Sequence, residues 1–245
     1  MIHRMDTPTP WHRGTLVAFD LETTGVDVAT DRIVTATVAI IDGATGDVEC
    51  REWLADPGIE IPEQATDVHG ITTAHAREHG HEPAVVLEEL HRALTDGWAR
   101  GPVVAYHASY DLSLLTTELA RHELDDLAVG AVIDPLVIDR AVDPYRPGRR
   151  TLTAAAAHYG VPLTEDQAHG ATADALTAAR IAWKLAVDYP DEIGAAEPEQ
   201  LHGWQGTWHA RWAEQFEAWL ARQPDREPET IPREWPVRQA VAVRD

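Results

Sequence analysis

Three strand-like segments come before the first helical pattern in this chain, and this order restricts the possible folds more than any other feature. Residues 15–20 (TLVAFD) form an apolar run, and residues 32–41 (RIVTATVAII) are rich in β-branched side chains. Residues 47–54 (DVECREWL) alternate apolar and polar side chains, after two turn signals that each contain glycine. The sequence therefore predicts a β-meander at the start of the fold.

Strand and helix patterns alternate in the next part of the chain. Short strands are expected at residues 103–106 and 131–134, and apolar or alanine-rich periodicity predicts helices at residues 83–98, 111–122, 151–159 and 171–188. A meander followed by alternating strands and helices is typical of an α/β fold with a mixed sheet that is covered by helices.

The charge balance excludes several classes of function. The chain of 245 residues has 20 Lys and Arg against 41 Asp and Glu, which gives a net charge of −21. Such a chain is not expected to coat polyanions or to bind anionic membrane surfaces, because both need clustered basic residues. Cys50 is the single cysteine, so no intrachain disulfide can form, and no apolar run approaches the length of a membrane span. We expect a cytoplasmic protein without a membrane partner.

The composition changes at about residue 190, where prolines become frequent. We expect a disordered leader at residues 1–13, one domain at residues 14–190, and a helical extension with a proline-containing tail at residues 191–245. Aromatic residues recur at helical spacing in the extension: Trp204, Trp208, Trp212, Phe216 and Trp219. This face packs either onto the domain or a second copy of the chain, or it binds a partner such as a protein of replication or repair.

Two carboxylates mark the end of the first strand. Asp20 and Glu22 are two residues apart, so in a strand both side chains point to the same face. Adjacent carboxylates repel each other unless a cation lies between them, and hard oxygen ligands suit Mg²⁺ or Mn²⁺. This pair is a candidate metal site.

Three more titratable residues stand near the starts of predicted helices. Asp111 follows the strand at residues 103–106, Asp174 opens the helix at residues 171–188, and His169 precedes Asp174 in a loop that contains a glycine. For each aspartate taken alone, a helix cap is the more common role. Their order and their contexts taken together favour a shared site.

The segments FDLETTG, AYHASYDLSLL and HGATADA resemble the three motifs of the DEDDh exonucleases. This DnaQ-like family includes the proofreading epsilon subunit of bacterial DNA polymerase III. The resemblance covers roughly residues 14–188 and places Asp20, Glu22, Asp111, His169 and Asp174 at the catalytic positions. It implies a ribonuclease H-like mixed β-sheet flanked by helices, here with a C-terminal helical extension.

The resemblance implies hydrolysis of the terminal phosphodiester at the 3′ end of DNA, mainly single-stranded, to release nucleoside 5′-monophosphates in proofreading or repair. Two Mg²⁺ or Mn²⁺ ions would be held by Asp20, Glu22, Asp111 and Asp174, with Asp20 bridging them, and His169 would take the proton of the attacking water. An RNA 3′–5′ exoribonuclease and a catalytically idle partner-binding module are the alternatives.

Further residues are expected to contact nucleic acid. By resemblance, Thr23 and Thr24 lie beside the terminal nucleotide, and Val68 and His69 lie against its base or sugar. Arg149 and Arg150 belong to a cluster with Arg140 and Arg146 that either touches backbone phosphates or balances Asp139 and Asp143. His107 stands where the family commonly has asparagine, which bears on substrate contacts more than on the metal site.

Overall fold

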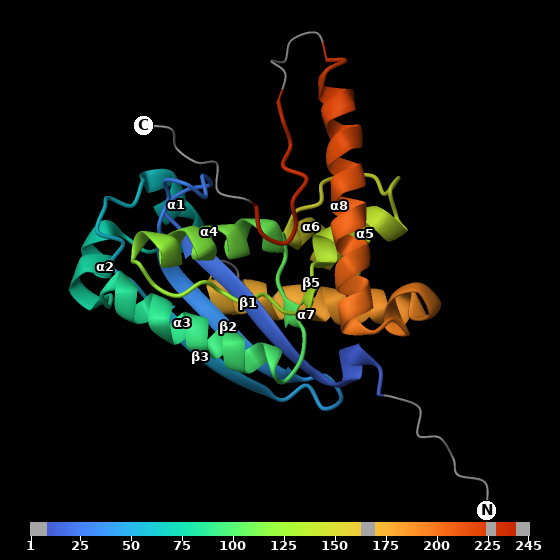
Figure 1. Ribbon diagram of the computed structural model, residues 1–245, viewed down its shortest axis with the longest axis horizontal. Coiled ribbons are helices and arrows are strands. Elements are labelled where there is room, and N and C mark those ends of the chain that lie inside the picture. The colour runs from blue at the N-terminus through green and yellow to red at the C-terminus, as the bar shows by residue number, and fades with distance from the viewer. Residues whose placement is uncertain (1–8, 163–169, 224–228, 239–245) are drawn as a thin grey trace, which may run out of the picture.

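The structure is a computed structural model that describes residues 9–162, 170–223 and 229–238. At its centre is a five-stranded sheet with the order β3-β2-β1-β4-β5 (Figure 1). Its strands are β1 (Thr15–Thr23), β2 (Ile33–Asp42), β3 (Val48–Leu54), β4 (Val103–Val104) and β5 (Val132–Ile133). The first three strands pair antiparallel, whereas β1, β4 and β5 run parallel. The expected meander and mixed sheet are confirmed.

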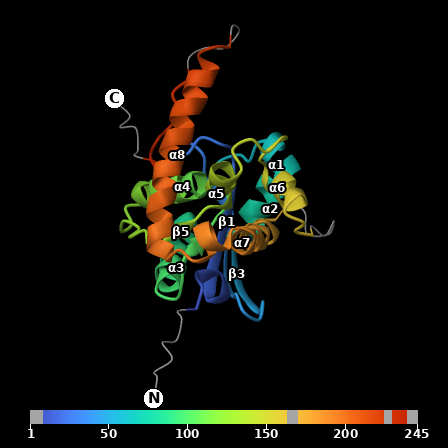
Figure 2. The same ribbon diagram turned by 90° about the vertical axis from the view of Figure 1, so that its right-hand side faces the viewer.

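Helices cover both faces of this sheet (Figures 1 and 2). The elements of the described residues are η1 (Trp11–Arg13), α1 (Glu63–His69), α2 (Thr73–His79), α3 (Pro83–Trp98), α4 (Ala108–Arg121), α5 (Pro135–Val142), α6 (Leu152–His158), α7 (Ala171–Asp188), a short π-helix η3 (Pro190–Gly194) and α8 (Pro198–Leu220). Helices α3 and α4 lie on one face, and α7 lies on the other.

Side chains along β1 alternate between the two faces of the sheet, and this alternation determines which helix Asp20 and Glu22 face. Val17, Phe19 and Leu21 are buried in the core beneath α3 and α4. Ala18 faces the other way and packs with Ala175 of α7, where small side chains let the helix approach closely. Asp20 and Glu22 are two and four residues after Ala18, so their side chains point to the same face of β1, towards α7.

Helices α1 and α2 are not among the helices expected from the sequence, and two further helices differ from the expectation. Helix α4 begins at Ala108 and not at Asp111, because the buried carboxylate of Asp134 accepts the main-chain N–H groups of His107 and Ala108, each at 3.0 Å. Helix α5 was not expected, although Asp134 followed by Pro135 is a typical helix start: the Asp134 side chain caps α5 through the Leu136 N–H.

Helix α8 closes the free edge of β5. The Gln205 side chain donates to the Val132 carbonyl at 2.8 Å and accepts the Asp134 N–H at 2.7 Å, and His202 Nδ1 accepts the Val132 N–H at 3.1 Å. These contacts satisfy backbone groups that an edge strand would otherwise expose.

The aromatic face of α8 is not the stripe that α8 buries most deeply. The buried residues are Leu201, Gln205, His209, Ala213 and Leu220. The expected aromatics occupy the neighbouring stripe, where Trp212 stacks on Phe216 and Phe216 stacks on Trp219. Trp204 and Trp219 remain exposed. Spacing alone could not distinguish two adjacent stripes of one helix.

Among the described residues, no helix has both the length and the apolar character needed to span a bilayer.

Candidate active site

Three carboxylates converge where β1 meets the first turn of α7. Asp20 and Glu22 come from the end of β1, beside a register shift in its pairing with β2 that falls between Glu22 and Thr23. Asp174 comes from the first turn of α7, which faces this part of the strand. One oxygen from each carboxylate can be chosen so that all lie within 4.8 Å of one another.

The local electrostatics disfavour the charged forms of these carboxylates. Burial, followed by the negative charges of Asp111, Glu22 and Asp174, raises the pKa of Asp20 well above its ordinary value. Burial and the charge of Asp174 raise the pKa of Glu22 to about 7. Burial and mutual repulsion therefore favour the protonated forms of Asp20 and Glu22.

Asp111 joins this cluster from the opposite helix layer. Its buried side chain lies in the first turn of α4, where its Oδ1 atom accepts the main-chain N–H of Leu21 at 3.2 Å. Burial raises the pKa of Asp111 well above its ordinary value, although this hydrogen bond opposes the effect. The bond fixes Asp111 against the residue between Asp20 and Glu22.

The donor set fits a hard divalent cation. Carboxylate oxygens are the ligands preferred by Mg²⁺ and Mn²⁺, and a cation would remove the repulsion that raises the pKa values of Asp20 and Glu22. Among the described residues, Asp20, Glu22 and Asp174 are the group whose ligand atoms lie close enough to share an ion. The structure thus brings together the four carboxylates expected from the sequence, with Asp111 beside this group.

His169, the expected general base, lies outside the described residues. The next residue, Gly170, is extended and forms the N-cap of α7. The chain therefore enters α7 directly before the turn that carries Asp174.

Thr23 and Thr24 make different contacts. The Thr23 hydroxyl lies 2.8 Å from the Tyr110 hydroxyl and donates to the Gly25 carbonyl at 2.6 Å. The Thr24 side chain is buried and donates to Asp31 at 2.8 Å, which stabilises the turn after β1. Thr23 is therefore the more accessible of the two expected contacts. Tyr110, which also donates to the Gly25 carbonyl, was missed by the sequence analysis despite its place in the second motif.

Val68 and His69 end helix α1 on the same side of the site. The Val68 side chain is exposed, whereas His69 is buried. Nδ1 of His69 accepts the Ile71 N–H at 3.1 Å, and Nε2 has no hydrogen-bond partner among the described residues. Burial lowers the pKa of His69, although a contact with the Thr23 backbone opposes this effect. The ring therefore stays close to Thr23.

His107 has a conformation that explains its residue type. It is the N-cap of α4 and has a left-handed backbone, with φ of 65° and ψ of 41°. Asparagine, aspartate and histidine are the side chains enriched in this region. Histidine therefore replaces the asparagine of the family pattern without losing the backbone geometry.

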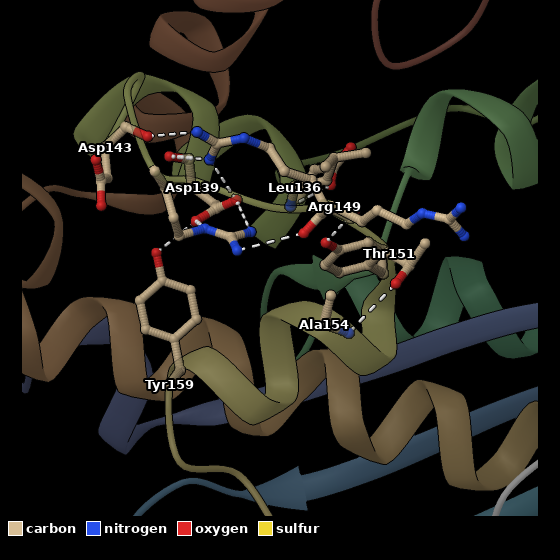
Figure 3. A network of polar contacts seen from close by, with 11 residues as sticks. Leu136, Asp139, Asp143, Arg149, Thr151, Ala154 and Tyr159 are labelled. Atoms are coloured by element: carbon tan, nitrogen blue, oxygen red, sulfur yellow. Dashed lines mark hydrogen bonds and ion pairs between the residues drawn. The ribbon is translucent and has the colours of Figure 1, made fainter.

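The expected arginine cluster is divided between structural and exposed roles (Figure 3). The fully buried Asp139 accepts hydrogen bonds from Arg146 Nη2 at 2.7 Å, from Arg150 Nη1 at 2.6 Å and from the Tyr159 hydroxyl at 2.6 Å. Burial would raise the pKa of Asp139, but these hydrogen bonds outweigh it and hold the pKa below its ordinary value. Arg146 and Arg150 thus balance Asp139, whereas the Arg149 side chain is exposed.

Comparisons with known proteins agree with this geometry. A family model described as "Exonuclease" matches residues 17–182. A DNA polymerase III PolC-type from Lacticaseibacillus paracasei is 28% identical over 201 residues, which are 82% of this chain and 13% of the relative. A DNA polymerase III subunit epsilon-like protein from Rhodobacter capsulatus is 31% identical over 182 residues, which are 72% of this chain and 24% of that protein.

Among solved structures, a zinc-bound complex of E. coli exonuclease I with single-stranded DNA matches with a TM-score of 0.64 and 20% identity. The match covers 84% of this chain and 45% of exonuclease I. The chain therefore spans less than half of this neighbour and 13–24% of the two curated relatives. The likeness shows a shared fold, the ribonuclease H-like mixed sheet expected from the sequence.

Proposed function

The chain belongs to the exonuclease family, and we propose that it is a metal-dependent 3′–5′ exonuclease that acts mainly on single-stranded DNA. The observation that carries this proposal is the convergence of Asp20, Glu22 and Asp174 within 4.8 Å, with Asp111 held beside them. An idle binding module would not need to keep these mutually repelling carboxylates together.

Each residue of the site has a distinct role in this proposal. Asp20, Glu22 and Asp174 would hold one divalent ion, and Asp111 with Asp20 would hold a second. When bound, such ions neutralise phosphate charge, lower the pKa of a water molecule and stabilise the leaving oxygen. The Leu21 N–H keeps Asp111 in place, and Thr23 with Tyr110 forms the adjacent wall for the terminal nucleotide. By the resemblance of the motifs, His169 would take the proton of the attacking water.

The direct test is degradation of end-labelled substrates by the purified chain. Single-stranded DNA, duplex DNA with a mismatched 3′ end, and RNA are each incubated with Mg²⁺, Mn²⁺ or EDTA. We expect loss of 3′ nucleotides from single-stranded DNA with either metal and none with EDTA. Preferential degradation of RNA would reassign the substrate, and intact substrates under every condition would reject the enzyme.

Single substitutions distinguish the loss of a catalytic carboxylate from a general destabilisation of the fold. Asp20→Asn should lower turnover by at least about 10³-fold, because the metal supplies several kcal/mol of transition-state stabilisation. Asp96→Asn, on the exposed side of α3, is the matched control and should be unchanged. His169→Ala should lose about 10²- to 10⁴-fold in turnover but keep the thermal stabilisation by Mg²⁺.

The expected partners form the second part of the proposal. The relatives are named as DNA polymerase III proteins, and one structural neighbour is a complex of exonuclease I with "SSB-Ct". Trp204 and Trp219 of α8 are exposed and available to a protein of replication or repair. Domain 14–190 would then carry the chemistry, and residues 191–245 would carry this contact. Replacing both tryptophans with serine should abolish co-purification with such a partner without changing turnover.

A further inference from the structure

Residues 229–238, which we call the return segment, run back along α8 towards the sheet (Figure 1). The Ile231 N–H donates to Glu217 Oε1 at 2.7 Å, and the Pro232 carbonyl lies 3.0 Å from His209 Nε2. Arg233 adds an ion pair with Glu217 at 2.9 Å. The segment is therefore fixed to α8 along its first half.

The second half of the return segment reaches the helix that carries Asp111. The Trp235 indole donates to Asp134 Oδ2 at 3.3 Å, and Trp235 and Val237 pack against the core beneath α4. The Arg238 N–H donates to the buried Ser113 hydroxyl at 2.8 Å. Because Ser113 follows Asp111 by two residues in α4, Arg238 is anchored beside the second exonuclease motif.

The backbone of Arg238 lies within hydrogen-bond distance of α4, the helix that also carries Tyr110. The Arg238 guanidinium is half-buried, and burial lowers its pKa. Its charge acts on Tyr110 and on His107, whose rings stack with centroids 6.4 Å apart. Tyr110 in turn contacts Thr23, the neighbour of Glu22. No carboxylate of residues 9–162, 170–223 or 229–238 forms an ion pair with Arg238.

A second arginine continues this positive surface away from the site. The Arg140 guanidinium lies over the Trp212 ring at 3.5 Å, and burial lowers its pKa to about 10. Its charge also acts on His107, as the charge of Arg238 does. Arg140 has no ion pair within the described parts of the chain, and it lines an open pocket of about 590 Å³ together with Arg211 and Trp208.

These two arginines lie where a nucleic-acid strand needs them. The chain has a net charge of −21, so phosphates behind the reacting end would be repelled without local cations. Guanidinium groups bind phosphates in a forked geometry, and neighbouring aromatic rings accept unpaired bases. A pocket that offers both groups matches a single strand better than it matches a folded protein surface.

Resting on the proposed exonuclease function, we propose that Arg238 and Arg140 bind backbone phosphates of the substrate strand on the 5′ side of its reacting end. The return segment thereby completes the substrate-binding face from outside the family match, which ends at residue 182. The ligand is a single strand of nucleic acid, and both arginines are positioning residues.

Binding is measured separately from turnover. The probe is a fluorescein-labelled oligothymidylate of about twelve nucleotides with phosphorothioate linkages at its 3′ end, titrated by anisotropy in Mg²⁺ at several salt concentrations. Arg238→Ala should weaken binding about tenfold, because a charge-assisted hydrogen bond is lost. The slope of log K against log salt should fall by about 0.7 for one lost contact and by about 1.4 in the double variant with Arg140→Met.

Two controls exclude an indirect effect. Arg238→Lys should keep the wild-type salt slope, because it retains the charge, and Arg92→Ala on α3 should change neither binding nor slope. Affinity and slope of Arg238→Ala within twofold of wild type would overturn the proposal. Binding of an acidic peptide in place of the oligonucleotide would overturn it too and would assign the pocket to a protein partner.

The outcomes also separate this inference from the proposed function. A wild-type protein that binds the probe through Arg238 but leaves unmodified DNA intact would reject the exonuclease and retain the binding surface. If the protein degrades DNA but the Arg238→Ala variant binds the probe as well as wild type, the exonuclease function is retained and the role of Arg238 is rejected.

Discussion

Asp134 Oδ1 accepts the main-chain N–H of His107 at 3.0 Å, across 27 residues of sequence. The same buried carboxylate also accepts the N–H groups of Ala108 and Leu136 and the Trp235 indole. One side chain thus fixes the start of α4, the start of α5 and the return segment. The position of Asp111 depends on it, because Asp111 lies in the first turn of α4.

Replacement of Asp134 by alanine should lower the free energy of unfolding by about 3 kcal/mol, because several buried N–H groups lose their acceptor. Urea unfolding measures this loss. Asp125→Ala, in an exposed loop, is the control and should change stability by less than about 0.5 kcal/mol. Equal stability of the two variants would show that the Asp134 contacts are not needed to hold α4.

The backbone of His107 predicts an unusual order of substitutions. Asparagine tolerates the left-handed region, so His107→Asn should keep wild-type stability. His107→Val should lose about 1–2 kcal/mol, because a β-branched side chain is strained at positive φ. Thermal unfolding of both variants checks this order. Equal stability of the valine variant would mean that α4 starts differently in solution.

Local rules predicted which carboxylates stand at the end of β1 and at the start of α7, but not that they meet. The period of two along β1 places Asp20 and Glu22 on one face, and the start of α7 supplies Asp174. The succession of strands and helices along the chain was equally accessible, because turn signals and periodicity are local. The resemblance of the motifs added Asp111, whose hydrogen bond to Leu21 spans 90 residues.

The remaining features depend on contacts that no local pattern encodes. Asp134 resembled an ordinary strand end, and its role became evident only when α4, α5 and Trp235 met around it. Helix α8 buries the stripe that contains Leu201 and Gln205, because this stripe faces the open edge of β5. The aromatic residues of α8 lie one residue earlier along the helix and so form the neighbouring stripe. For the arginines near Asp139, the sequence left phosphate contact and charge balance open, and only the fold shows that Arg146 and Arg150 pair with Asp139.

The buried group around Asp139 should be sensitive to the loss of one cation. Arg146→Met leaves the buried carboxylate with fewer partners and should cost about 3 kcal/mol. Arg149→Ala is the matched control on the same loop and should leave stability unchanged, because that side chain is exposed. Because the pKa of Asp139 is lowered, its contribution is present above pH of about 4 and is lost as the pH falls below that value. Urea unfolding at neutral and acidic pH tests both statements.

Arg149 remains a predicted phosphate contact. Charge reversal in Arg149→Glu should raise KM for long single strands about fivefold and leave kcat unchanged, because the contact would act on binding alone. Arg180→Glu, on the exposed side of α7, makes the same change of charge elsewhere. Steady-state kinetics compare the two variants. An equal KM in both would mean that Arg149 only contributes to the overall charge.

The carboxylate cluster predicts that metal stabilises the fold more at high pH than at low pH. The pKa of Glu22 is raised to about 7, so the folded chain binds more protons than the unfolded chain between pH of about 4.5 and 7. Without metal, the contribution of Glu22 to stability should therefore be greatest below this range and decline as the pH rises through it. A divalent cation replaces the protons, so Mg²⁺ should raise Tm strongly near pH 8 and little near pH 5. Calorimetry with Mg²⁺ or EDTA at both pH values measures the difference. Glu22→Gln should reduce this difference in the Mg²⁺ effect on Tm, whereas the control Glu88→Gln on α3 should not. An equal effect of Mg²⁺ on Tm at both pH values would contradict a metal site that includes Glu22.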